Sequence, residues 1–144
     1  MRVVFDLDGT LCNIEHRLHF IQGPKKDWPA FLRACVDDKP IWNLIKVCRL
    51  MSFNEDHVEV WSGRSEDVRI ETVNWLSRHG LGIIDGLRMR KSGDYRQDCI
   101  VKGEWLDALP ENERPDIVFD DRQQVVDMWR SRGILCCQVA PGDF

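Results

Sequence analysis

The sequence has no long hydrophobic run, no paired-cysteine motif and no excess of basic residues. No apolar stretch approaches the roughly 20 residues that a membrane-spanning helix requires. Met1 and Arg2 lead straight into an apolar segment without the pattern of a signal peptide. We therefore expect no membrane partner and a cytoplasmic location. The net charge of −4 argues against broad electrostatic binding to nucleic acid, although a local basic site is compatible with it.

The cysteines show neither a CxxC spacing nor a histidine pairing that would indicate a zinc site. Adjacent side chains on a strand face opposite sides, so neighbouring cysteines are not expected to pair. We expect free thiols in a reducing compartment. The six residues are Cys12, Cys35, Cys48, Cys99, Cys136 and Cys137.

The length of 144 residues predicts a single domain spanning residues 1–144. A composition of 43% hydrophobic and 31% charged residues is typical of a soluble globular protein. There are no internal repeats, low-complexity tracts or obvious linkers. Only residues 12–38 are long enough to form a small cap or a substrate-facing insert.

Predicted strands and helices alternate along the chain, which indicates an α/β, Rossmann-like, mostly parallel sheet with helices on both faces. Pro40 is expected to open one helix and Ser65 to cap the next. The predicted strands are 2–7, 57–62, 87–90, 115–121 and 134–140, and the predicted helices are 27–38, 40–51, 65–80, 97–109 and 122–133.

Two pairs of acids follow two of these strands: Asp6 and Asp8 after the first, Asp120 and Asp121 after the fourth. In parallel sheets, ligands bind beyond the carboxyl ends of the strands. Carboxylates are costly to bring together in a partly buried place unless a cation or a shared proton compensates. Two acid pairs on adjacent strand ends would form an all-oxygen site suited to Mg²⁺.

Donors and positive charge gather at the same strand ends, where they could bind a phosphate. Each signal has a plain structural alternative: "DLDGT" could be a turn, "WSGR" a strand-to-helix turn, "FDD" a helix cap, and a lone lysine a solvated residue. An EF-hand loop is excluded because Leu11 and Arg17 stand where glycine and an acid are required. The four motifs occur in this order on alternating strands and helices, which favours a phosphate site. Its candidate residues are Thr10, Ser62, Gly63, Arg64 and Lys102.

On these motifs the sequence resembles the haloacid dehalogenase-type phosphohydrolase superfamily. "DLDGT" matches its first motif, Ser62 its second, Lys102 its third, and Asp120 with Asp121 its fourth. The similarity covers the whole chain and implies a minimal fold with a small cap.

A closer resemblance is to the 3′-phosphatase domain of bacteriophage polynucleotide kinase-phosphatases. It rests on "VVFDLDGTLC" followed by Arg17, on Arg64 in "VWSGR", and on Arg90, Asp98 and Lys102 in "RKSGDYRQDCIVK". The run "FDDRQQVVDMWRSRGILCCQVAPGDF" is similar over its full length. No GxxxxGK[ST] phosphate loop occurs, so a 5′-kinase activity is not expected.

The resemblance implies roles for these residues. Asp6 would be the nucleophile that forms an aspartyl-phosphate, and Asp8 the general acid and base. Mg²⁺ would be held by the Asp6 carboxylate, the Asp8 carbonyl and the second acid pair, with Asp121 the direct ligand and Asp120 its support, or the reverse. Asp98 would orient Lys102, or it is simply an acid at a helix N-terminus.

The sequence leaves the roles of several basic and aromatic residues undecided. A local basic cluster consists of Arg88, Arg90, Lys91 and Arg96. It either contacts a nucleic-acid backbone or is a solvated loop. The match of Arg90 to the family favours contact. We expect His16 and His19 at the surface or in packing, with contact to a substrate as the alternative. Four tryptophans are expected in the core, Trp61, Trp75, Trp105 and Trp129, whereas Trp28 and Trp42 are left open.

The leading hypothesis is a Mg²⁺-dependent phosphatase acting on the 3′ ends of DNA or RNA, with a possible separate kinase or ligase as partner. The alternatives are a phosphatase of nucleotides or other small phosphomonoesters, and a catalytically idle binding module.

Overall fold

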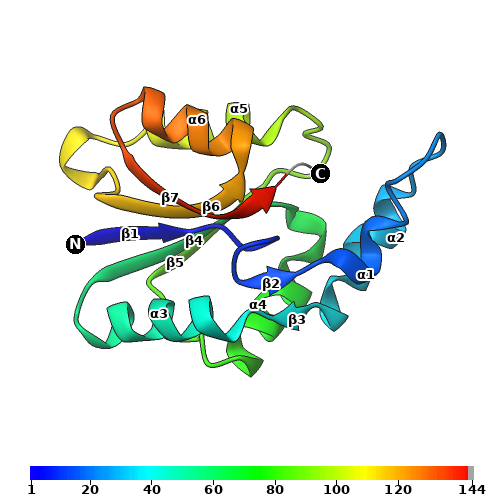
Figure 1. Ribbon diagram of the computed structural model, residues 1–144, viewed down its shortest axis with the longest axis horizontal. Helices are drawn as coiled ribbons and strands as arrows, with labels where there is room; N and C mark the ends of the chain where they lie inside the picture. The colour runs from blue at the N-terminus through cyan, green and yellow to red at the C-terminus, as the bar shows by residue number, and fades with distance from the viewer. Residues whose placement is uncertain (143–144) are drawn as a thin grey trace.

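A computed structural model describes residues 1–142 and contains a five-stranded, entirely parallel sheet (Figure 1). Its strand order is β5-β4-β1-β6-β7, so the first strand of the chain lies at the centre. This confirms the predicted α/β fold class. The strands are β1 (Arg2–Phe5), β4 (His57–Ser65), β5 (Gly86–Arg90), β6 (Ile117–Arg122) and β7 (Leu135–Gly142).

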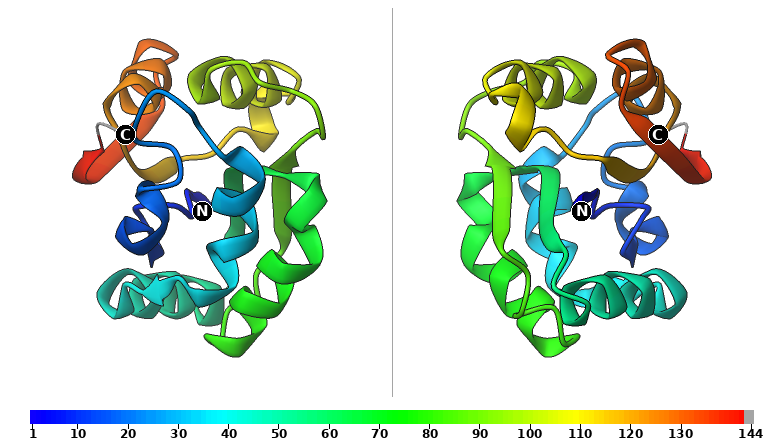
Figure 2. Two further views of the ribbon diagram at one scale, coloured as in Figure 1. Left: turned by 90° about the vertical axis from the view of Figure 1, so that its right-hand side faces the viewer. Right: turned by 90° about the vertical axis from the view of Figure 1, so that its left-hand side faces the viewer.

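Helices cover both faces of this sheet, as the alternating pattern predicts. α3 (Trp42–Phe53) and α4 (Arg69–Arg78) lie on one face, and α5 (Asp98–Asp107) and α6 (Gln123–Ser131) on the other (Figures 1 and 2). Because side chains alternate along a strand, β1 supplies both cores. Val3 and Phe5 join the cluster under α3 and α4, and Val4 joins the cluster under α5 and α6.

Two expected helix starts differ from the structure. Pro40 does not open α3: it lies in the short strand β3 (Lys39–Pro40), and the Ile41 N–H donates to the Leu11 carbonyl, which keeps the chain extended until Trp42. Ser65 caps a 3₁₀ turn, η2 (Glu66–Val68), that precedes α4, and its Oγ accepts from the Asp67 N–H.

The helix expected over 27–38 divides into α2 (Trp28–Arg33) and a 3₁₀ helix, η1 (Ala34–Asp37). The segment 12–38 also contains β2 (Cys12–Asn13) and α1 (Glu15–Leu18), neither of which the sequence patterns indicate. β2 pairs with β3 antiparallel. α1 and α2 project beyond the carboxyl ends of the sheet strands, and we call residues 14–37 the cap (Figure 1).

Of the four tryptophans expected in the core, Trp61, Trp75 and Trp129 are buried and Trp105 is partly buried against the same cluster. Trp28 and Trp42, which the sequence leaves open, are exposed. No helix within residues 1–142 has both the length and the apolar character needed to span a bilayer. The predicted single-domain organisation stays a prediction.

Candidate active site

The carboxyl end of the central strand holds a buried charge cluster built around Asp6 and Lys102. Asp6 directly follows β1 and is only 5% exposed. Lys102 lies in the second turn of α5, and its Nζ is 2.6 Å from Asp6 Oδ1 and 2.9 Å from Asp120 Oδ2. Residues that are far apart in the sequence, on β1, α5 and β6, therefore meet at one point.

This cluster contains more acid than its one lysine neutralises. Burial and the charges of Asp120 and Asp121 raise the pKa of Asp6, although Lys102 opposes the rise. Burial alone would lower the pKa of Lys102, but Asp120 and Asp6 outweigh it and raise that pKa, so the ammonium stays protonated. The remaining negative charge favours binding of a further cation.

The acids that could hold such a cation include Asp121. Carboxylate oxygens of Asp6, Asp120 and Asp121 all lie within 4.8 Å of one another. Asp121 Oδ1 is buried without a hydrogen-bond partner among the described residues. Burial and the neighbouring Asp120 raise the pKa of Asp121 to about 7. Buried, unpaired carboxylate oxygens fit a hard divalent cation.

Two glycines lie against the Asp121 carboxylate, where a larger side chain would clash with it. A Cβ at Gly9, where φ is +88°, would lie 2.2 Å from Asp121 Oδ2. A Cβ at Gly142, at the end of β7, would lie 2.4 Å from the same oxygen. The glycine in the first motif is thus required by the second acid pair and not by its turn alone.

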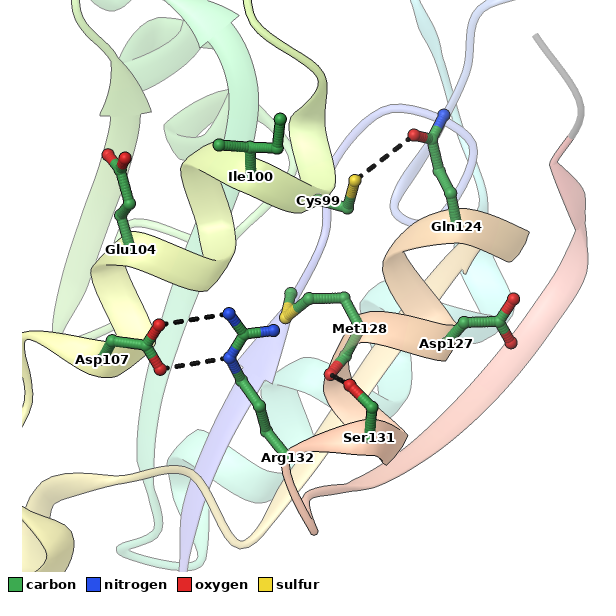
Figure 3. Close-up of a pocket in the computed structure, with 9 residues that line it drawn as sticks. All are labelled: Cys99, Ile100, Glu104, Asp107, Gln124, Asp127, Met128, Ser131 and Arg132. Carbon is green, nitrogen blue, oxygen red and sulfur yellow. Dashed lines mark hydrogen bonds and ion pairs between the residues drawn. The ribbon is translucent and has the colours of Figure 1, made fainter.

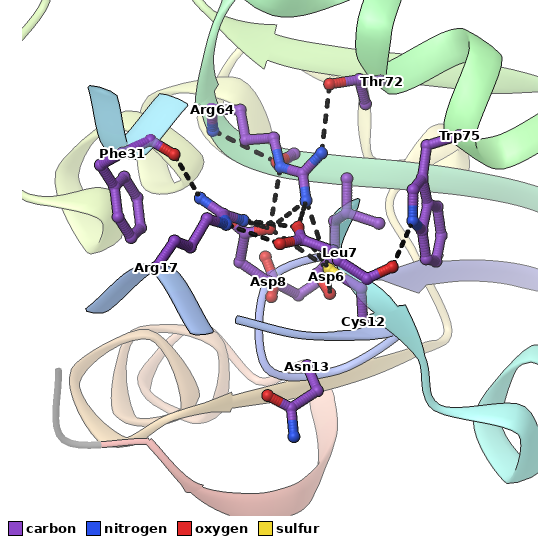
Figure 4. A network of polar contacts seen from close by, with 12 residues as sticks. Asp6, Leu7, Asp8, Cys12, Asn13, Arg17, Phe31, Arg64, Thr72 and Trp75 are labelled. Atoms are coloured by element: carbon purple, nitrogen blue, oxygen red, sulfur yellow. Dashed lines mark hydrogen bonds and ion pairs between the residues drawn. The ribbon is translucent and has the colours of Figure 1, made fainter. Parts of the chain in front are cut away.

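Asp8 belongs to a second, adjoining cluster in which arginines supply the positive charge (Figure 4). Its Oδ1 accepts from Arg64 Nη2 at 2.6 Å and from Arg17 Nη2 at 2.9 Å. Burial alone would raise the pKa of Asp8, but Arg64 and Arg17 outweigh it and hold that pKa well below its usual range. Asp8 is therefore ionised in this state.

Asp38 completes the second cluster and is not among the site residues predicted from the sequence. Its two oxygens accept from Arg17 Nε and Nη2, both at 2.7 Å, and Arg64 Nη2 also donates to Oδ2. His16 Nε2 lies 2.8 Å from Asp38 Oδ1, so His16 contacts this network. No local motif marks Asp38. The pairing of β2 with β3 brings it to the site.

The carboxylates of Asp8 and Asp38, with Cys12, form another group with metal-ligand spacing. Two guanidinium groups already fill the space between these acids, so we assign no metal to it. Cys12 Sγ lies 3.4 Å from Asp8 Oδ1, and burial followed by the Asp8 charge raises the pKa of its thiol. All six cysteines are free, as the sequence analysis expects.

The remaining phosphate-site candidates lie around these clusters. Ser62 is fully buried, and its Oγ accepts from the Arg64 N–H at 3.2 Å. Thr10 Oγ1 is buried without a partner among the described residues. A Cβ at Gly63 would lie 2.5 Å from Asp98 Oδ1, and Asp98 Oδ2 lies 3.5 Å from Lys102 Nζ, one helical turn away.

The basic cluster at 88–96 is largely satisfied within the protein. Arg90 donates to the Gly63 carbonyl, to backbone carbonyls of the loop after β5, and to Asp98 Oδ1, and its side chain is 14% exposed. Arg88 pairs with Glu59, and Arg96 pairs with two acids. These arginines fix the loop and the start of α5.

A separate groove of about 510 Å³ lies between α5 and α6, away from these strand ends (Figure 3). None of its lining residues belongs to the two charge clusters. They include Ile100, Glu104, Asp127 and the ion pair of Asp107 with Arg132.

Comparisons with known proteins identify the family and agree with the fold. The family described as "Polynucleotide kinase PNKP phosphatase domain" matches residues 1–144. A chain in "Structure of Pnkp1/Rnl/Hen1 complex" is 31% identical with a TM-score of 0.82, and the match covers 99% of this chain and 47% of that one. A chain in "Structure of the Pnkp1/Rnl/Hen1 RNA repair complex" is 32% identical with a TM-score of 0.80, covering 99% and 43%.

The chain thus spans less than half the length of these two solved chains. A putative phosphatase from Clostridium difficile shares the fold at 15% identity, with a TM-score of 0.67 over 94% of this chain and 83% of that one.

Proposed function

Because the chain belongs to the family of polynucleotide kinase phosphatase domains, whose members are phosphatases, we propose that it is a Mg²⁺-dependent polynucleotide 3′-phosphatase. It would remove the 3′-phosphate from DNA or RNA ends. The observation that carries the proposal is the contact of Asp6 with Lys102 beside Asp120 and Asp121, at the carboxyl end of β1.

Asp6 is the nucleophile in this proposal. Its carboxylate attacks phosphorus, the bond to the 3′ oxygen breaks, and an aspartyl-phosphate forms, which water then hydrolyses. Lys102 holds Asp6 in place and donates to the transferring phosphoryl oxygens. Phosphate monoesters are among the slowest substrates in water, so charge neutralisation has to supply most of the acceleration.

The Mg²⁺ ion would be held by the carboxylates of Asp6, Asp120 and Asp121 and the Asp8 carbonyl. When bound, it supplies positive charge to the phosphoryl oxygens. Asp121 is the better candidate for direct ligand, because its Oδ1 has no other partner among the described residues, whereas Asp120 already accepts from Lys102.

Asp8 is the general acid and base, a role worth about 10²–10⁴ in rate. Arg17 and Arg64 favour its ionised, water-activating form in the absence of substrate. A bound phosphate would attract the same two guanidiniums, which are suited to phosphate oxygens. Asp8 would then take up a proton from solvent, give it to the leaving 3′ oxygen, and afterwards accept a proton from the hydrolytic water. Ser62, Gly63 and Thr10 line this phosphate position, and Asp98 and Arg90 support it from α5 and β5.

We further propose that the partners are RNA ends and separate end-processing enzymes such as a kinase or ligase. One of the similar solved chains belongs to an assembly described as an RNA repair complex. The absence of a GxxxxGK[ST] motif in this sequence leaves the 5′-kinase step to another protein or segment.

The experiment is phosphate release from a 3′-phosphorylated oligonucleotide, measured with Mg²⁺ and with chelator. The same oligonucleotide with a 5′-phosphate, a 3′-mononucleotide, and the Asp6→Asn protein run alongside. Metal-dependent release from the 3′ end alone, lost in Asp6→Asn, supports the proposal. Equal or faster turnover of the mononucleotide would indicate that the substrate is a small phosphomonoester. No phosphate release from any of these substrates would indicate a catalytically idle binding module.

A further inference from the structure

The outer part of the cap carries a small exposed surface made of Lys25, Lys26 and Trp28, which we call the cap tip. It lies where the chain passes from α1 to α2, the part of the cap that projects furthest from the sheet (Figure 1). Trp28 is 44% exposed, although a tryptophan gains most by burial.

The cap tip is basic in a chain whose net charge is −4. Residues 19–34 contain three cations, Lys25, Lys26 and Arg33, and a single acid, Asp27. That acid is already engaged, because Asp27 Oδ1 accepts from the Ala30 N–H at 2.9 Å and caps α2. Neither lysine forms an ion pair with any residue in the described range 1–142, and Lys26 Nζ lies 5.8 Å from the centre of the Trp28 ring.

The cap tip connects to the active site through side-chain contacts. The Trp28 ring meets the Phe31 ring edge-on, with centroids 5.8 Å apart. The Arg17 guanidinium lies 4.3 Å from the centre of the Phe31 ring, and Arg17 donates to Asp8. A ligand stacked on Trp28 would therefore be connected, through Phe31, to Arg17, which lies beside the proposed phosphate position.

Most other basic residues near the strand ends are less suitable for binding a polyanion, although Lys91 in the loop after β5 is exposed as well. Arg88, Arg90 and Arg96 each pair with acids of the protein. Arg17 and Arg64 are buried in the Asp8 and Asp38 cluster. The lysines of the cap tip are exposed to solvent.

We propose that the cap tip binds the single-stranded segment of a polynucleotide next to its 3′ end, a step that rests on the proposed function. Lys25 and Lys26 contact backbone phosphates, and one base stacks on Trp28. Exposed aromatic rings beside a positively charged track are the usual means of binding single strands without sequence preference. The cap tip would then favour a polymer over a mononucleotide, which is too short to reach it.

Two variants test the proposal, Lys25→Gln/Lys26→Gln and Trp28→Ala. The matched control is Lys46→Gln/Arg78→Gln, which removes the same charge from exposed positions on α3 and the last turn of α4. The first measurement is binding of a fluorescent 3′-phosphorylated oligonucleotide in an Asp6→Asn background, which does not depend on turnover. The second is the ratio of kcat/KM for that oligonucleotide to kcat/KM for a 3′-mononucleotide.

We expect Trp28→Ala to weaken oligonucleotide binding about 5- to 150-fold, as one lost stacking interaction implies. Lys25→Gln/Lys26→Gln should reduce the slope of log K against log salt by about 1.4, since each single-strand phosphate contact contributes ~0.7. Both variants should lower the ratio of kcat/KM for the oligonucleotide to kcat/KM for the mononucleotide. The control should change neither oligonucleotide binding nor this ratio.

Unchanged binding, salt slope and ratio in both cap-tip variants would overturn the inference even where the unaltered protein prefers oligonucleotides. Equal loss in the cap-tip variants and in the control would also overturn it, because only net charge would then matter. A protein that turns over mononucleotides better than oligonucleotides would instead contradict the proposed function.

Discussion

The Lys102 ammonium lies 2.6 Å from Asp6 Oδ1, in a buried position where it also contacts Asp120. One cation on α5 thus links the ends of β1 and β6. The ammonium stabilises the fold because it compensates the charge of buried acids. In the proposed mechanism it would also contact the oxygens of the phosphoryl group that is transferred to Asp6.

Lys102→Met should therefore impair stability and turnover together. Removing one partner of a buried ion pair costs about 3–5 kcal/mol in the free energy of unfolding. Loss of a preorganised charge at the reacting group lowers kcat by about 10²–10³. Denaturant unfolding in chelator and steady-state kinetics measure the two effects, with the exposed Lys46→Met as control. An active variant of unchanged stability would contradict the account.

Asp38→Asn should reduce turnover although Asp38 is not expected to touch substrate. Asp38 holds Arg17 and Arg64 against Asp8, and a shift of about 1 Å in such groups costs roughly 10²-fold in rate. Kinetics at a temperature where the variant remains folded separate this loss from unfolding. The neighbouring exposed residue supplies the control, Asp37→Asn, and equal kinetics in the two variants would count against a positioning role for Asp38.

Asp121→Asn should remove most of the stabilisation by Mg²⁺. A ligand at 100 times its Kd stabilises a protein by about 2.7 kcal/mol, so saturating Mg²⁺ should raise the Tm of the unaltered protein. Asp121 Oδ1 is a buried carboxylate oxygen without a hydrogen-bond partner among residues 1–142, and the change to an amide removes its charge, so most of that shift should be lost. Thermal unfolding across a Mg²⁺ titration measures it, with Asp127→Asn on α6 as control. An undiminished shift would place the metal elsewhere.

Glu59 gives a pH-dependent prediction outside the active site. Burial alone would raise its pKa, but hydrogen bonds from His57 and Trp61 and the charge of Arg88 outweigh it and lower the pKa below the ordinary value of 4.5. Its contribution to stability is therefore fully present above that value and is lost as the pH falls through the folded-state pKa.

Glu59→Gln should accordingly lower the free energy of unfolding by about 1–3 kcal/mol at neutral pH, with a smaller difference at acidic pH. Urea unfolding at several pH values tests this, with the exposed Glu111→Gln as control. A difference that does not vary with pH would mean that packing, and not the charge of Glu59, is responsible.

Much of the fold could be predicted because local pattern and global topology agree. The apolar run ending at Phe5 and the run ending at Phe119 read as strands, and the structure pairs them side by side. Pro40 misled the prediction because a proline is tolerated both at a helix start and in a short bridge. Only the long-range hydrogen bond from Ile41 to Leu11 decides between the two.

The candidate site could be predicted in part for the same reason. Asp6, Asp8, Asp120 and Asp121 stand at strand ends, where parallel topology brings them together. Asp38 could not be predicted, since it reaches the site through the pairing of β2 with β3 at the base of the cap. The reason for Gly63 was also out of reach, because it depends on how closely Asp98 of α5 approaches the turn after Ser62.

The most direct test of the central claim follows the phosphorus atom itself. An oligonucleotide carrying a radiolabelled 3′-phosphate is mixed with the protein and Mg²⁺, quenched in acid within one turnover, and the protein is digested. The account predicts transient label on the peptide containing Asp6, its decay as free phosphate appears, and no label in Asp6→Asn. Phosphate release without labelled protein, or label on a peptide lacking Asp6, would contradict it.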